Sequence, residues 1–568
     1  MDTPMNDKQP WYQYYPEGLT HNIDALQHKS LADFLRDKVN QFGTKPAFTH
    51  FGTTITYNEL DRLSGYFAGF LQAQLGKQKQ QRVVIMLPNL LQYPIVLFGI
   101  LRAGFIAINT NPLYTSRELQ YQIVDSQAAA IIILENFAHV LEPIIPETSL
   151  RRIIITGMGD VFSPLKSFAC NFLVRYIKRS VPKFVIPSAI SYTAAMQEGA
   201  KHRFNPPDIE LSDLAFLQYT GGTTGISKGV MLTHKNLLSN VEQAKQWITH
   251  GNSAGKELQL GQEKVLTALP LYHIYALTAN FLVFISLGAH NYLVTDPRNL
   301  KNLATLLSTQ QINCFTGVNT LYAGLVVSKH LLNNDLSHLK LCLAGGMATR
   351  KTVADQWQQL TGSPLIEAYG LTEASPAVSI NPMNSETFTG SAGLPLSSTS
   401  CEIRNPEGKE LPIGEVGEIY VKGPQVMQGY WRHPEETAKQ LTPDGWLKTG
   451  DIGRFDDKGL LYLVDRKKDM IIVSGFNVYP NEVEEVVSSH PDVLECGAIG
   501  VTDEKAGEAV KVFIVKKQPD LSEKSILDYC RLNLTGYKIP KYIEFKQSLP
   551  KSTVGKILRK DLKMGKFL

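Results

Sequence analysis

Short apolar runs alternate with amphipathic stretches along the first two thirds of the chain. A strand covered on both faces is a brief continuous run of Val, Ile and Leu, whereas a helix repeats its apolar positions every three or four residues. We predict strands over residues 82–87, 105–108, 130–134, 152–156, 264–269, 312–315, 339–343 and 364–368, separated by helices such as 235–247 and 351–360. This alternation predicts an α/β fold with largely parallel sheets.

The pattern changes after about residue 390, where Gly and Pro separate short strands at 417–423 and 459–464. A charged run follows at 465–469, and beyond it the pattern is α+β. There we predict helices over 481–490 and 523–534 and strands over 496–501 and 510–516. We therefore predict a large N-terminal domain, residues 1–465, with two α/β subdomains and a β-rich subdomain. A small α+β domain, residues 466–568, follows it.

Composition narrows the class of protein. The chain has 568 residues, of which 43% are hydrophobic and 19% charged, which is typical of a globular protein. A net charge of +4 does not imply binding to nucleic acid. The six cysteines form no C-x-x-C pair, so neither a zinc site nor a disulfide framework is expected, and a reducing cytosol fits. We see neither a signal peptide nor an apolar run that could span a bilayer, and we predict a cytoplasmic protein.

One stretch combines apolar and basic residues at helical spacing. Its apolar members are Leu165, Phe168, Phe172 and Tyr176, and its basic members are Lys166, Arg175, Lys178, Arg179 and Lys183. Such a stretch suits the anionic surface of a membrane, but a helix packed on the domain with solvated charges would have the same pattern. Our hypothesis is peripheral contact with the inner face of a membrane.

The most informative segment is 219–229, Tyr-Thr-Gly-Gly-Thr-Thr-Gly-Ile-Ser-Lys-Gly. Its glycines allow several backbone N–H groups to face one point, and its hydroxyls and lysine add to a site for a polyphosphate. The Walker A pattern fails because Ser227 precedes Lys228 and Gly229 follows it. The segment also matches G-x-S-x-G, the nucleophile elbow of serine hydrolases, with Ser227 as nucleophile. That elbow needs a strand leading into the serine, whereas a Thr/Gly-rich loop precedes it here.

Further motifs follow in order: Pro270-Leu271-Tyr272-His273, Ala344-Gly345-Gly346, Tyr369-Gly370-Leu371-Thr372-Glu373, Thr449-Gly450-Asp451, Asp465-Arg466-Lys467-Lys468 and Gly555-Lys556. Together with the phosphate loop they resemble the adenylate-forming superfamily, which includes acyl-CoA synthetases, firefly luciferases and peptide-synthetase adenylation domains. The resemblance covers nearly the whole chain. The stretch 444–468, with 475–482, is most similar to bacterial long-chain fatty acid–CoA ligases.

The resemblance implies a two-step reaction. ATP and a fatty acid would give an acyl-adenylate and pyrophosphate, and coenzyme A would then take the acyl group and release AMP. Magnesium would help screen the repulsion between the carboxylate and the α-phosphate. The alternative within the superfamily is an acyl-AMP ligase that serves a carrier protein, although no carrier domain follows Lys556. The serine hydrolase using Ser227 is a remote alternative from another class.

The resemblance also implies roles for particular residues. Catalytic roles fall to Lys556, which would neutralise charge at the α-phosphate, to His273, which would orient the substrates, and to Glu373. Magnesium ligands would be Glu373 and Thr220; the family usually has a hydroxyl residue where Gly221 stands, so that contact is missing. Tyr369 would stack on adenine, and Asp451 would accept hydrogen bonds from the ribose. The remaining nucleotide-binding or cofactor-binding residues would be Gly221, Gly222, Thr223, Thr224, Gly225, Lys228, Gly345, Gly346, Gly370, Thr372, Arg466 and Gly475.

Movement of the small domain completes the expectation. The resemblance places a hinge near Lys468, so that Lys556 would serve adenylation and then swing out while Gly475 lines the thiol channel. The acyl pocket would lie near Tyr275, Val318 and Gly346. The expected partners are a long-chain fatty acid, ATP, coenzyme A and a membrane surface, with a homodimer as a further hypothesis.

Overall fold

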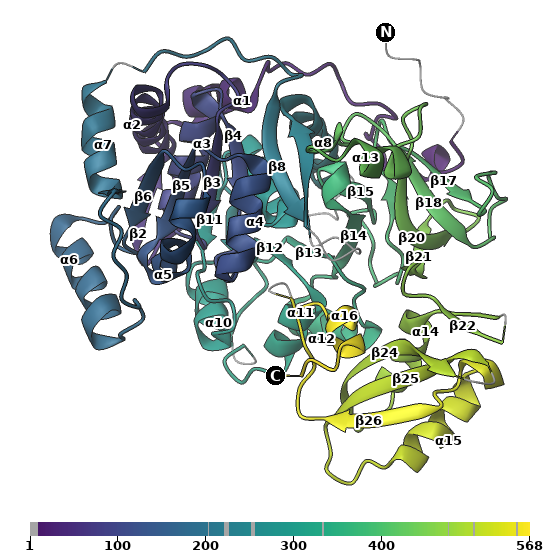
Figure 1. Cartoon of the computed structure of the whole chain (residues 1–568). Coiled ribbons are helices and arrows are strands. Elements are labelled where there is room, and N and C mark those ends of the chain that lie inside the picture. The colour runs from purple at the N-terminus through teal and green to yellow at the C-terminus, as the bar shows by residue number, and fades with distance from the viewer. Residues whose placement is uncertain are drawn as a thin grey trace.

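The computed structural model describes residues 9–202, 204–220, 227–250, 256–331, 334–474, 476–503, 506–552 and 555–567. Four sheets organise these residues, three in a large N-terminal part and one in a smaller C-terminal part. Figure 1 shows the smaller part beneath the sheet that contains β20 and β21, with its last helix, α16, turned toward α11 and α12 of the larger part.

The first sheet has eight strands in the order β19-β9-β8-β4-β3-β5-β6-β7. Its strands from β8 to β7 run parallel to their neighbours, while β8 and β9 form an antiparallel pair. In β5 the sequence Ala-Ile-Ile-Ile-Leu is buried at every position, as expected of a parallel strand covered on both faces. The bounds are β3 (Arg82–Met86), β4 (Ile106–Asn109), β5 (Ala130–Leu134), β6 (Arg152–Thr156), β7 (Ala189–Ser191), β8 (Leu214–Thr220), β9 (Lys228–Thr233) and β19 (Gly429–Tyr430).

The second sheet has nine strands in the order β16-β15-β14-β13-β12-β10-β11-β1-β2. The six strands from β14 to β1 are parallel, and antiparallel strands lie at both ends. The bounds are β1 (Pro46–His50), β2 (Thr53–Thr56), β10 (Lys264–Thr267), β11 (His290–Leu293), β12 (Cys314–Gly317), β13 (Leu341–Gly345), β14 (Ile366–Gly370), β15 (Ala377–Ile380) and β16 (Leu394–Pro395).

Helices cover these two sheets, and their ends follow local sequence signals. The first residue of α2 follows Thr56, whose side chain forms a capping box with Glu59. The α-helices of this part are α1 (Leu31–Phe42), α2 (Tyr57–Leu75), α3 (Gln92–Arg102), α4 (Ser116–Ser126), α5 (Ala138–Leu141), α6 (Pro164–Phe172), α7 (Tyr192–Lys201), α8 (His234–Thr249), α9 (Val283–Ser286), α10 (Leu300–Thr309), α11 (Asn319–Val326), α12 (Lys351–Thr361) and α13 (Pro434–Gln440). Short 3₁₀ turns are η1 (Tyr12–Tyr14), η2 (Glu135–Phe137), η3 (Glu142–Glu147) and η6 (Thr372–Ala374), and π-helical segments are η4 (Leu173–Ile177) and η5 (Ala276–Leu282).

A third, antiparallel sheet has the order β17-β18-β20-β21, with bounds β17 (Ser400–Arg404), β18 (Gly417–Lys422), β20 (Leu447–Phe455) and β21 (Leu461–Arg466). A turn at residues 467–469 connects it to the fourth sheet. That sheet and its helices comprise β22 (Ile471–Val473), β23 (Phe476–Val478), β24 (Val493–Asp503), β25 (Gly507–Lys516), β26 (Tyr542–Lys546), α14 (Pro480–Ser488), α15 (Glu523–Asn533), η7 (Gly536–Lys538) and α16 (Arg559–Lys563).

The predicted fold class is confirmed: two mainly parallel α/β layers, a β-rich layer and a small α+β domain follow in the expected order. Strand ends differ by a few residues. The predicted strand at 312–315 begins too early, because the Ile312 N–H bonds back to the Leu307 carbonyl and ends α10, so that pairing starts only at Cys314. The boundary between 465 and 466 stays a prediction, and it falls at the last residues of β21.

Candidate active site

A cleft of about 2990 Å³ lies between the large and small domains, lined from both. Every predicted site residue within the described ranges lines it: Thr220, Lys228, His273, Gly345, Gly346, Tyr369, Gly370, Thr372, Glu373, Asp451, Arg466 and Lys556. Gly221, Gly222, Thr223, Thr224, Gly225 and Gly475 lie outside the described residues. The structure therefore brings together residues that are separated by more than half of the sequence.

The floor of the cleft is the edge where parallel strands β13 and β14 end. β13 ends at Gly345 and β14 at Gly370, and ligands of α/β proteins commonly bind at such carboxyl ends. Gly370 is required by close packing, since a Cβ there would overlap the Pro376 carbonyl oxygen. The turn after β14 then carries Thr372 and Glu373 in η6.

A polar chain joins β14 to the β20–β21 sheet. The Tyr369 hydroxyl donates to Asp451 Oδ2 at 2.7 Å, and Arg466 Nε lies 3.2 Å from Asp451 Oδ1. Asp451 and Arg466 face each other across the β20–β21 ladder, so their side chains have fixed spacing. Burial, with the Asp451 charge nearby, raises the pKa of Tyr369 well above its ordinary value, so the phenol stays protonated and can donate.

The Glu373 carboxylate is half-buried and oriented by one hydrogen bond. The Tyr430 hydroxyl, from β19, donates to Glu373 Oε1 at 2.9 Å. Burial raises the pKa of Glu373. Within the described residues no three His, Cys, Asp or Glu gather as a metal cage. A magnesium ion beside Glu373 would thus take most of its ligands from phosphate and water, which is its usual coordination in nucleotide sites.

The two strands that flank the predicted phosphate loop bring Thr220, Ser227 and Lys228 to the cleft. The Ser227 hydroxyl donates to the Thr220 carbonyl at 2.7 Å. The Lys228 ammonium forms an ion pair with Glu436 of α13 and lies 5.3 Å from the centre of the Tyr430 ring. Ser227 leads directly into strand β9, whereas the serine of a nucleophile elbow leads into a helix, and its hydroxyl donates to a carbonyl, so the geometry is not that of a nucleophile elbow.

His273 begins the turn before η5 and is half-buried. Burial lowers its pKa to about 4, so the imidazole is neutral near pH 7. Its Nδ1 accepts a hydrogen bond from the Tyr275 backbone N–H at 3.3 Å. A neutral imidazole can orient a polar substrate group but adds no positive charge to the cleft.

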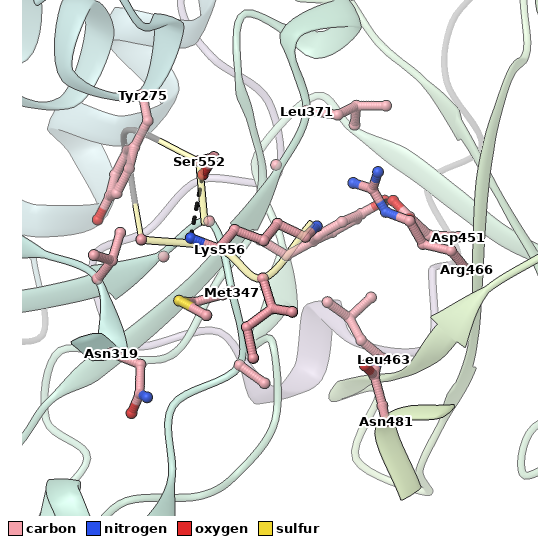
Figure 2. Close-up of a pocket in the computed structure, with 18 of the residues that line it drawn as sticks. Tyr275, Asn319, Met347, Leu371, Asp451, Leu463, Arg466, Asn481, Ser552 and Lys556 are labelled. Atoms are coloured by element: carbon pink, nitrogen blue, oxygen red, sulfur yellow. Dashed lines mark hydrogen bonds and ion pairs between the residues drawn. The ribbon is translucent and has the colours of Figure 1, made fainter. Parts of the chain in front are cut away.

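Lys556 enters the cleft from the small domain on a tight loop. The Ser552 N–H donates to the Lys556 carbonyl at 2.8 Å, and the Lys556 N–H donates to Ser552 Oγ at 3.1 Å. Figure 2 shows the Lys556 side chain extended toward Asp451 and Arg466. Burial, and then the Arg466 charge, lowers the pKa of Lys556 to about 8. Gly555 has φ of +78°, and a Cβ there would overlap the Thr320 hydroxyl of α11, so this loop sits directly on the large domain.

Sequence reasoning missed the ion cluster that anchors this loop. Arg559 pairs with Asp465 at 2.9 Å, with Asp469 at 3.3 Å and with Glu484 at 2.8 Å. The charged run at 465–469 stood out in the sequence, but nothing in the sequence shows that Arg559 pairs with it. Tyr430 and Glu436 were also missed, because their roles follow from contacts with Glu373 and Lys228 that only the fold creates.

Comparisons with known proteins agree with this geometry. The family model described as AMP-binding enzyme matches residues 35–431, and the AMP-binding enzyme C-terminal domain matches 482–556. A long-chain-fatty-acid–CoA ligase of Escherichia coli O6:H1 is 49% identical over 98% of both chains, and one of Bacillus subtilis is 39% identical over 98% of both. The crystal structure of ATP-bound MatB from Rhodopseudomonas palustris aligns with TM-score 0.81 and 28% identity, covering 94% of this chain and 98% of that one. With matches of this extent, the chain belongs to the AMP-binding enzyme family.

Proposed function

We propose that the protein is a long-chain fatty acid–CoA ligase that works through an acyl-adenylate. The observation that carries the proposal is the meeting of Lys556 with the Tyr369–Asp451–Arg466 chain in one interdomain cleft. In the first step a fatty carboxylate oxygen bonds to the α-phosphorus of ATP, and the bond to pyrophosphate breaks. In the second, the coenzyme A sulfur bonds to the acyl carbon, its proton leaves, and AMP departs.

The large domain holds the nucleotide in this proposal. Tyr369 stacks on adenine, with its hydroxyl tied to Asp451, and Asp451 still has lone pairs to accept the ribose hydroxyls. Gly346 leaves room for the base at the strand ends, since a Cβ there would meet only Val318, at 3.8 Å, whereas Gly345 and Gly370 allow close packing of the protein beneath it. The phosphate loop and Lys228 take the β- and γ-phosphates, which requires Lys228 to exchange its pairing with Glu436 for one with phosphate.

Lys556 supplies positive charge where the adenylate forms. Attack of an anion on a phosphate is opposed by repulsion, and a preorganised ammonium in a partly desolvated cleft lowers that barrier. Arg466 lies on the same side and adds to the field, which is also why it depresses the pKa of Lys556. The neutral His273 orients the carboxylate.

We propose Glu373 and Thr220 as the residues that hold magnesium. A carboxylate oxygen aimed into the cleft by Tyr430 suits a hard cation that keeps its phosphate ligands. When bound, the ion would neutralise charge on the phosphates. Glu373, oriented by Tyr430, would determine the position of the ion in the cleft.

An apolar arm of the cleft supports a long acyl chain as substrate. Behind Tyr275, Val318 and Gly346, where the acyl pocket was expected, the lining continues along one face of α8 and along η5. The α8 residues are Asn240, Ala244 and Ile248, spaced four apart, and the η5 residues include Thr278 and Ala279. Asn240 and Thr278 donate to the Ala377 and Ser375 carbonyls. The apolar side chains of Ala244, Ile248 and Ala279 suit a chain of methylene groups.

The second step needs a different face of the small domain. We propose that the domain turns about the segment 467–469, near Lys468, which withdraws Lys556 and brings Gly475 to the thiol channel. The turn between β21 and β22 is a suitable place, since a short connection between two sheets can absorb a change in backbone angles.

We further propose that the protein works in the cytoplasm, in peripheral contact with the inner face of a membrane, where its poorly soluble substrate gathers. Among the helices within the described ranges, none has the length and apolarity to cross a bilayer. The homodimer stays a hypothesis without a supporting contact.

The test is an assay of AMP, pyrophosphate and acyl-CoA with fatty acids of increasing length. The proposal expects each acyl-CoA to be matched by one AMP and one pyrophosphate, with the highest kcat/KM for long chains. Adenylate formation without transfer to coenzyme A, but with transfer to an acyl carrier protein, would establish the alternative ligase. Hydrolysis without ATP would contradict the proposal outright.

A further inference from the structure

Helix α6 and the π-helical segment η4 are attached to the body by their polar face. Lys166 Nζ donates to the Phe51 carbonyl at 2.5 Å and to Thr53 Oγ1 at 2.9 Å. Asn171 bonds Asp160 Oδ1 at 2.8 Å, and Arg175 forms an ion pair with the buried Glu135. The residues that hold this element in place are therefore mostly polar.

The opposite face is apolar and exposed. Leu165 is 87% exposed, Phe168 71% and Ile177 67%, and Phe172, Leu173 and Tyr176 are exposed beside them. Phe168, Phe172 and Tyr176 form a continuous row, with neighbouring ring centroids 6.0 and 5.1 Å apart. α6 has no buried residue at all, and η4 buries only Val174. This is the reverse of a surface helix in a globular protein, whose apolar face packs inward.

The charge around this face has one sign. The sequence from Val161 to Gln197 contains no Asp or Glu. Three cations that follow the apolar row in the sequence, Lys178, Arg179 and Lys183, are exposed. An aromatic and aliphatic face bordered by cations fits the boundary between acyl chains and anionic headgroups. In Figure 1, α6 lies at the margin of the molecule, on the side away from the small domain, and its apolar side chains are left exposed by the part of the chain that the structure describes.

We propose that the exposed face of α6 and η4, comprising Leu165, Phe168, Phe172, Leu173, Tyr176 and Ile177, is the surface that docks on an anionic lipid bilayer. The choice of a lipid partner rests on the proposed function, because a fatty acid substrate partitions into membranes. The polar attachment explains the inverted arrangement: Lys166, Asn171 and Arg175 hold the element while its apolar side chains enter the headgroup layer. The exposed cations draw this face toward anionic lipid.

The experiment is flotation of the full chain with vesicles of phosphatidylcholine, with and without phosphatidylglycerol. The wild type is expected to bind the anionic vesicles, and Phe168→Ser/Phe172→Ser/Tyr176→Ser to bind them roughly tenfold or more weakly, since three aromatic groups no longer enter the bilayer. Lys178→Gln/Arg179→Gln/Lys183→Gln is expected to remove the preference for phosphatidylglycerol. The matched control, Leu260→Ser/Leu532→Ser, changes leucines that are also exposed, at 57% and 84%, and is expected to bind like the wild type.

Equal binding by the aromatic triple variant and the wild type would overturn the inference, as would failure of the wild type to bind either vesicle. A wild-type dimer that the triple variant dissociates would assign the face to a second copy of the chain and also overturn it. Activity on a long-chain fatty acid supplied in detergent micelles, without vesicles, separates the two proposals: it should be unchanged in every variant, and its absence in the wild type would count against the ligase function instead.

Discussion

The two halves of the cleft are built differently. On the large domain, Tyr369, Asp451 and Glu373 lie on or next to strands and are oriented by hydrogen bonds from neighbouring strands. On the small domain, Lys556 lies on a loop, and its position depends on the turn at Ser552 and on the Arg559 ion cluster three residues further on. A rigid half can hold the nucleotide in the same place during both reaction steps. A half that is anchored by only a few contacts can change its position between the two steps.

The largest effect is expected from the rigid half. Glu373→Gln keeps the shape of the side chain but removes the charge that would hold magnesium, so the rate of ATP–pyrophosphate exchange should fall about 10²- to 10³-fold. Tyr430→Phe removes only the orienting hydrogen bond and should cost about 1 kcal/mol, or roughly fivefold. Similar losses in the two variants would show that the carboxylate acts through Tyr430, not through a metal.

The second effect concerns Arg559, which anchors the loop of Lys556 in the small domain. Arg559→Gln leaves the fully buried Asp465 side chain and Glu484 without their cation, and an uncompensated buried charge typically costs about 3–5 kcal/mol. We expect lower thermal stability of the small domain and at least about tenfold slower adenylation, because Lys556 is no longer held in the cleft. Arg531→Gln, which breaks an exposed ion pair with Asp528 in the same domain, is the control and should change neither. Slower adenylation in Arg559→Gln without a loss of thermal stability would show that Arg559 positions Lys556 and is not needed for the fold of the small domain.

The strands and the ion pairs of the cleft were not equally predictable from the sequence. The strand that ends at Gly345 was predictable because a fully buried parallel strand is a continuous apolar run. The strand that ends at Gly370 contains Glu367 and is only partly buried, but the motif at residues 369–373 marks its end. The partners of the charged side chains were not. Arg559 bonds residues 75 to 94 positions away, and Lys228 bonds Glu436 across 208 positions, and no local pattern encodes which charges meet. The outward face of α6 was visible as a periodicity, but its direction required the fold.

A third effect is the pH dependence that Lys556 of the small domain would give to adenylation. The pKa of Lys556 is lowered to about 8. In the proposed mechanism only the protonated ammonium would stabilise the charge that develops during adenylation. Its contribution is therefore present below about pH 8 and is lost as pH rises through that value, so kcat/KM for ATP should fall on the alkaline side. Lys556→Arg should move this decline to higher pH, because guanidinium stays charged. An alkaline limb that is the same in the variant would assign the titration to another group.

The smallest effect concerns Glu436, which pairs with Lys228 and, in the proposed mechanism, would compete with phosphate for it. Glu436→Gln frees the lysine, and the KM for ATP should fall by about two- to fivefold, the range expected for one partly exposed ion pair. Glu435→Gln makes the same change of charge on the same helix and should leave the KM unchanged. A higher KM in Glu436→Gln would mean that Glu436 positions Lys228 for ATP and does not compete with it.

The division of labour between the two halves is tested most directly by measuring both half-reactions in Lys556→Ala, with Lys551→Ala as the matched lysine of the same loop. The account predicts that Lys556→Ala slows acyl-adenylate formation about 10²- to 10³-fold. Thioester formation from supplied acyl-AMP and coenzyme A should stay within about threefold of the wild type. Lys551→Ala should leave both steps near the wild-type rates. An equal loss of both steps in Lys556→Ala would contradict the account.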